Sequence, residues 1–87
     1  MSVIVQPTPN PNAMKFVLSS TRFAQPLSFA SAEAAATHPL AAQLFAVGDI
    51  YNVFMAQDFV TVNKLPELDW ASLIRQLQPV LEQFDAK

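Results

Sequence analysis

The sequence predicts an α+β fold, a largely antiparallel β-sheet with two helices packed on one face. Two observations lead to this prediction: short runs rich in β-branched residues are joined by brief connections, and two later segments repeat apolar residues at the helical period. The 87 residues suffice for one domain, 1–87, and 52% of them are hydrophobic while only 14% are charged. A small domain needs this apolar composition because it buries a smaller share of its surface than a large one.

The first part of the chain predicts two strands joined by a stiff connection. Val3–Val5 is β-branched, and Met14–Leu18 alternates apolar residues on one face. Between them, Pro7–Asn12 contains three prolines and two asparagines. Proline fixes its own φ and asparagine bonds to nearby backbone, so this loop is expected to be ordered. After a loop over Ser19–Pro26, Leu27–Phe29 predicts a short third strand.

The middle of the chain predicts a short helical turn and then a longer helix. Ser31 is placed to cap an alanine-rich turn over Ala32–Ala36, and Pro39 suits the first position of the next helix. That helix is expected to end at Gly48, the only glycine in the chain. We expect a left-handed backbone conformation there. Glycine is the usual residue in that conformation, because any residue with a Cβ pays about 1 kcal/mol to adopt it.

A hairpin and a final helix complete the predicted order of elements. Ile50–Met55 and Phe59–Lys64 are β-rich and separated by three residues, which indicates an antiparallel pair. Asp69 is a good N-cap for the last helix, and Pro79 inside that helix is expected to kink or split it. The apolar stripe of this helix comprises Trp70, Leu73, Ile74, Leu77, Leu81 and Phe84.

Charge and cysteine content exclude several classes of function. Five basic residues are scattered among seven acidic ones, for a net charge of −2, so no basic stripe exists to bind nucleic acid. No apolar stretch approaches the roughly 20 residues of a membrane span, and no signal peptide is visible, so we expect a cytoplasmic protein. Without cysteine the chain has no thiolate ligand for a metal or cluster, and we expect no cofactor.

His38 is the single histidine and the first candidate for chemistry. It precedes Pro39 at a predicted helix start, where an imidazole can act as a cap, and this structural interpretation is preferred. Two alternatives remain open: weak iron binding by His38 with surface carboxylates, and a small enzyme that uses His38 as its base. No metal-ligand spacing, nucleophile arrangement or glycine-rich phosphate loop is present, so we expect no metal site and no enzyme.

The proline-rich connection is the second candidate. Thr8, Asn10, Asn12 and Lys15 gather polar groups on and beside a rigid loop, which is where binding residues are often found. We therefore predict that these four residues bind a protein partner. The alternative is that the asparagines fasten the loop to the strands around it.

Four motifs, in the right order over nearly the whole chain, resemble the Nfu/NifU scaffold N-terminal domain family. They are Thr8–Phe16, His38–Phe45, the hairpin residues Val53-Phe54 and Asp58–Val62, and Asp69-Trp70. The resemblance implies that in full-length members this domain precedes a Cys-X-X-Cys domain. That second domain holds a four-iron, four-sulfur cluster between two protomers. The resemblance therefore implies the stand-alone first domain, a non-catalytic module of iron–sulfur cluster assembly or delivery. Its expected partner is an assembly factor or a client apoprotein.

Overall fold

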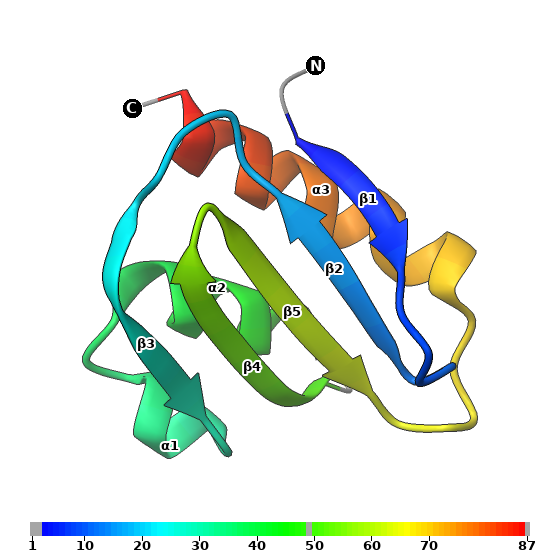
Figure 1. The fold of residues 1–87 in the computed structure, drawn as a ribbon. Helices are drawn as coiled ribbons and strands as arrows, with labels where there is room; N and C mark the ends of the chain where they lie inside the picture. Colours follow the sequence, from blue (N-terminus) through cyan, green and yellow to red (C-terminus); the bar gives the residue numbers. More distant parts are fainter. Residues whose placement is uncertain (1–2, 49, 87) are drawn as a thin grey trace.

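The computed structural model describes residues 3–48 and 50–86, and its centre is one five-stranded sheet (Figure 1). The strands lie in the order β1-β2-β5-β4-β3, and every neighbouring pair is antiparallel. Three helices accompany the sheet: α1 (Ala32–Ala35), α2 (Pro39–Ala46) and α3 (Trp70–Asp85). The strands are β1 (Ile4–Pro7), β2 (Ala13–Val17), β3 (Phe23–Phe29), β4 (Ile50–Gln57) and β5 (Phe59–Lys64).

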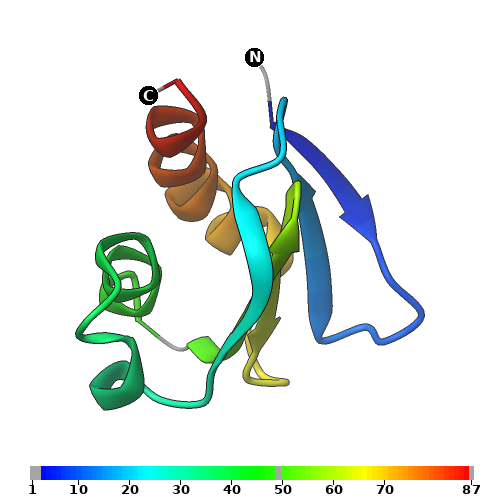
Figure 2. The ribbon, with the colours of Figure 1, turned by 60° about the vertical axis from the view of Figure 1, so that its left-hand side comes forward.

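All three helices lie on one side of the sheet, as the edge-on view shows (Figure 2). The core lies between these two layers and combines alternate strand residues with the apolar stripe of α3. Its largest fully buried side chains are Phe16, Leu44, Met55, Leu77, Leu81, Val53, Val60 and Val62. The predicted fold class is confirmed, and α1 adds a third helix to the two that were expected on this face.

The predicted helix ends are confirmed in detail. Ser31, His38 and Asp69 are the N-caps of the three helices, and each side chain accepts a backbone N–H of the first turn. Gly48 has φ +98° just beyond α2, and a Cβ built there meets no atom within 4 Å. The left-handed backbone alone therefore accounts for glycine at this position.

The loop predicted over Ser19–Pro26 is wrong in its second half, where β3 already begins at Phe23. This strand contains Pro26, which donates no backbone hydrogen bond. β3 lies at the edge of the sheet, however, and pairs with β4 alone. An edge strand tolerates proline on its unpaired side, and the pairing register shifts between Phe23 and Leu27.

Pro79 does not split the last helix. α3 runs over 16 residues from Trp70 to Asp85 with Pro79 inside it. Its buried residues Leu73, Leu77 and Leu81 face the sheet, while Pro79 lies on the exposed side. The lost backbone hydrogen bond therefore lies toward solvent, and the packed face holds the helix together.

Candidate partner-binding surface

The sheet face opposite the helices is left uncovered by the described residues. Cross-strand pairing places Phe16, Val60 and Met55 in one row beneath the helices. The neighbouring rows face the other way, because side chains alternate along a strand. One of these rows is Val17, Phe59 and Ala56, and the other is Lys15, Thr61 and Phe54. We call this side the open face; it comprises Ile4, Gln6, Lys15, Val17, Phe54, Ala56, Phe59 and Thr61.

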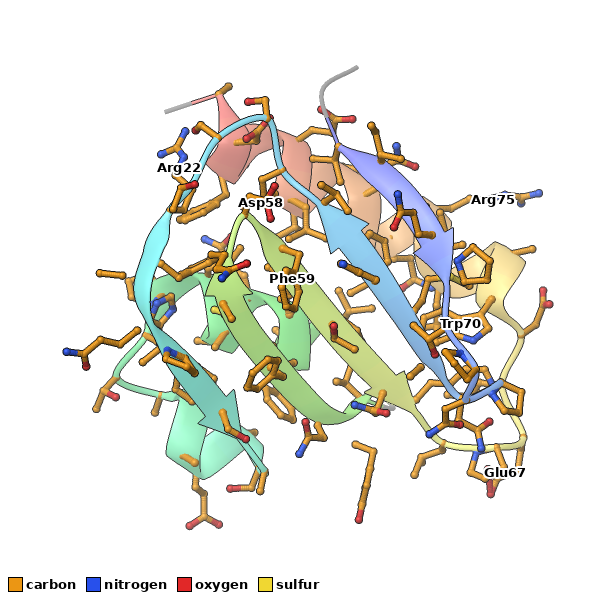
Figure 3. The ribbon with its side chains drawn as sticks, in the orientation of Figure 1. Arg22, Asp58, Phe59, Glu67, Trp70 and Arg75 are labelled. Atoms are coloured by element: carbon orange, nitrogen blue, oxygen red, sulfur yellow. The ribbon has the colours of Figure 1, made fainter. Side chains whose placement is uncertain are left out.

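Aromatic rings and one lysine form the centre of the open face. The rings of Phe54 and Phe59 are 6.2 Å apart between centroids, and Lys15 Nζ lies 4.4 Å from the Phe59 centroid. Figure 3 shows Phe59 in front of the sheet, with the helices behind it. Both rings are partly exposed, and Ile4 at the edge of the same face is 56% exposed. Uncovered apolar groups of this kind are typical of interaction surfaces.

The connection between β1 and β2 is ordered by its own polar groups, as predicted. The Thr8 hydroxyl lies 2.9 Å from the Asn10 carbonyl oxygen and 3.0 Å from that of Ala13, and it accepts the Asn10 N–H. The Asn12 N–H in turn donates to Asn10 Oδ1 over 2.9 Å. These bonds are the side-chain turns that Thr and Asn favour.

Two residues from the far end of the chain hold this loop in place. The Lys64 backbone N–H donates to the Asn12 carbonyl (2.8 Å), and Lys64 Nζ donates to Asn12 Oδ1 (3.1 Å). Trp70 Nε1 donates to the Pro11 carbonyl over 2.9 Å, and Trp70 lies beside the loop in Figure 3. Nothing in the sequence pointed to Lys64, because a strand-end lysine is ordinarily solvated, yet here it is 7% exposed.

The structure thus separates the four predicted partner-binding residues. Thr8, Asn10 and Asn12 fasten the loop, which is the alternative that the sequence left open. Lys15 lies on the open face beside Phe59. A hollow of about 280 Å³ next to the loop is lined by Asn10, Asn12, Tyr51, Asn63, Lys64, Leu65 and Pro66. A role in binding stays a prediction for all four residues.

Asn12→Ala tests whether the loop asparagine is structural. The substitution leaves Lys64 Nζ, on a residue 7% exposed, with one hydrogen-bond acceptor fewer. Removing a partner of a buried polar group costs about 1–3 kcal/mol of unfolding free energy, and we expect that loss in urea denaturation. Asn10→Ala is the comparison: it removes an exposed bond, from the Asn12 N–H to Asn10 Oδ1, and should cost less than half as much because water can replace that acceptor. Equal losses would mean that the bond to Lys64 is worth no more than the exposed one.

His38 takes the structural role preferred from the sequence. Its Nδ1 accepts the Ala41 N–H over 3.4 Å, and its ring lies 5.4 Å from that of Phe29. Over residues 3–48 and 50–86, no three histidine, aspartate or glutamate side chains come together in a group that would hold a metal ion. The described geometry therefore offers no support for iron binding through His38. Within the same residues, no helix combines the length and the apolar character needed to cross a membrane.

Comparison with known proteins gives a consistent result. A family model described as "Scaffold protein Nfu/NifU N terminal" matches residues 3–87. The human protein "NFU1 iron-sulfur cluster scaffold homolog, mitochondrial" is 36% identical over 99% of this chain. "Conserved virulence factor C" of Staphylococcus aureus is 35% identical over 85% of it. The chain spans only 35% and 20% of the length of these two relatives, respectively.

Two solved structures have the same architecture. The solution structure of a NifU-like protein from Saccharomyces cerevisiae has a TM-score of 0.81 and 26% identity, over 98% of this chain and 79% of that one. A crystal structure of a Staphylococcus aureus protein has a TM-score of 0.78 over 92% of this chain and 98% of that one. At 23% identity, the second likeness concerns the fold alone.

Proposed function

Because the chain belongs to the Nfu/NifU N-terminal family, we propose that it is a non-catalytic protein-binding module of iron–sulfur cluster assembly or delivery. It binds an assembly factor or a client apoprotein, and it holds no thiolate-ligated cluster itself because it contains no cysteine. The cluster is the cargo of the process in which this module takes part. Action in the cytoplasm remains a prediction; the human relative is named as a mitochondrial protein.

One observation supports a binding role above the others: the open face. A sheet in an α+β domain normally buries one face and can leave the other solvated with polar residues. Here the solvated side carries Ile4, Val17, Phe54 and Phe59 as a continuous group over four neighbouring strands. Aromatic side chains, phenylalanine among them, are enriched in protein interfaces relative to the rest of the surface. The open face is therefore the proposed binding surface.

Photo-cross-linking in the cells that make the protein tests this proposal. A photoreactive phenylalanine analogue replaces Thr61, at the centre of the open face, and in a matched variant it replaces Gln76, exposed on α3. Mass spectrometry then identifies the captured proteins. We expect iron–sulfur assembly factors or cluster-containing clients to be enriched from position 61 over position 76. If neither class is enriched from position 61, the proposal is wrong.

A further inference from the structure

The charge on the open face is opposite in sign to that of the whole chain. The chain has a net charge of −2, yet none of its five strands contains an aspartate or glutamate. The described carboxylates lie instead in helices, at their caps or in turns. Lys15 is the single charged side chain of the open face, since Lys64, the other strand lysine, faces the helix side with Val60 and Val62.

From this charge pattern we infer that the open face takes an acidic, apolar segment of a protein partner, with a partner carboxylate on Lys15. The inference rests on the proposed function and adds the chemistry of the partner. Apolar side chains of the segment cover Phe54 and Phe59, and its aspartate or glutamate meets the ammonium group. The ammonium group of Lys15 is already held 4.4 Å from an aromatic ring centroid, so its side chain loses less conformational entropy when a carboxylate binds.

Lys15 has the neighbours that such recognition needs. Its cross-strand partners are Gln6 on β1 and Thr61 on β5, both uncharged. The described contact of Lys15 Nζ is with the ring of Phe59, and a phenyl ring carries no formal negative charge. A carboxylate that approaches from solvent therefore meets a cation on an apolar floor. There, partial exclusion of water strengthens the attraction between the two charges.

Other occupants fit this face less well. A second copy packed through the same face brings another Lys15 and no carboxylate, because an isologous interface repeats one surface on both sides. A nucleic acid or an anionic membrane presents many phosphates, and one lysine neutralises a single charge. One cation among aromatic rings matches one carboxylate among apolar side chains, which is the composition of a protein segment.

Peptide display on the purified chain tests the inference without any pathway protein. A library of random twelve-residue peptides is selected on the immobilised protein, and enriched peptides are titrated against ¹⁵N-labelled protein by NMR. We expect Asp and Glu to be enriched beside apolar residues, with the largest shift changes at Lys15, Phe59 and Thr61. Lys15→Glu should weaken binding of the enriched peptides at least tenfold, while Lys15→Arg stays within about threefold because the charge is kept.

Arg75→Glu is the matched control, because it makes the same change in net charge at an exposed position of α3. It should leave the affinity within about twofold. Peptides that bind the open face without acidic enrichment, or that bind Lys15→Glu as well as the wild type, overturn the inference and leave the cross-linking result untouched. The inference also fails if no enriched peptide shifts the open face, and the proposed function then rests on cross-linking alone.

Discussion

Phe16→Ala is expected to reduce the unfolding free energy by about 3–5 kcal/mol, the usual range for emptying a buried phenylalanine site. Phe16 is 0% exposed, and it lies in the same cross-strand row as the fully buried Val60 and Met55. Small domains have only about 5–15 kcal/mol of stability in total, so this loss takes a large part of it. Urea denaturation followed by Trp70 fluorescence measures the change, because Trp70 packs against the same core.

The neighbouring residue provides the control for this prediction. Val17→Ala removes apolar atoms from the same strand, but on the open face, where Val17 stays partly exposed. We expect it to cost less than about 1 kcal/mol, since little apolar surface leaves the core. Equal losses of unfolding free energy at positions 16 and 17 would mean that the open face is covered. Neither the proposed binding role nor the acidic partner segment could then be assigned to that face.

The predictions that held were those fixed by local chemistry. The apolar period of Trp70–Phe84, the cap at Asp69 and the glycine at position 48 each act within a few residues, so the sequence alone sufficed for them. The alternation of Met14–Leu18 identified the helix-facing row of β2 in the same way. Propensity and period therefore predicted which face of each element is buried.

The predictions that failed depended on position within the sheet. Residues 23–26 belong to the edge strand β3 and not to the predicted loop, and strand order is set by long-range pairing that no local pattern reveals. The hairpin connection is one residue shorter than predicted, because Ala56 belongs to the paired strands. Ala56 pairs with Phe59, and the turn passes through Gln57 at φ +52°, a conformation that usually signals glycine or asparagine.

For the candidate binding residues, too, local sequence predicted less than contacts between distant parts of the chain. Lys15 was selected for its closeness in sequence to the proline-rich loop, but its neighbour in space is Phe59, 44 residues later. The side chain and the carbonyl of Asn12 bond to Lys64, which is distant in the sequence, and only the Asn12 N–H bonds nearby, to Asn10. The residues that make up the open face could not be listed from the sequence, because alternation gives each strand two faces but not which strands lie side by side.

Asp85→Ala is expected to lower the free energy of unfolding by about 2–3 kcal/mol, because the Asp85 carboxylate accepts hydrogen bonds that hold the end of α3. Asp85 is 6% exposed, and its Oδ1 accepts two hydrogen bonds from Ser19, one from the backbone N–H (3.0 Å) and one from the hydroxyl (2.9 Å). Arg22 donates to the Asp85 carbonyl, and its guanidinium group lies 5.3 Å from the Phe84 ring. These contacts tie the β2–β3 connection to the last turn of α3.

A carboxylate in the last turn opposes the helix dipole by about 0.3–1 kcal/mol, so relief of that repulsion offsets part of the loss. The hydrogen bonds dominate, since two charge-assisted bonds to a buried oxygen outweigh one unfavourable dipole contact. Ser19→Ala removes the hydroxyl bond alone and should cost about 1 kcal/mol. Together with Asp85→Ala and the double variant it completes a thermodynamic cycle. A coupling energy near zero would mean that the hydroxyl bond contributes nothing, and an Asp85→Ala variant as stable as the wild type would contradict the role of both bonds. Gln83→Ala, exposed on the same turn, should change stability by less than about 0.5 kcal/mol.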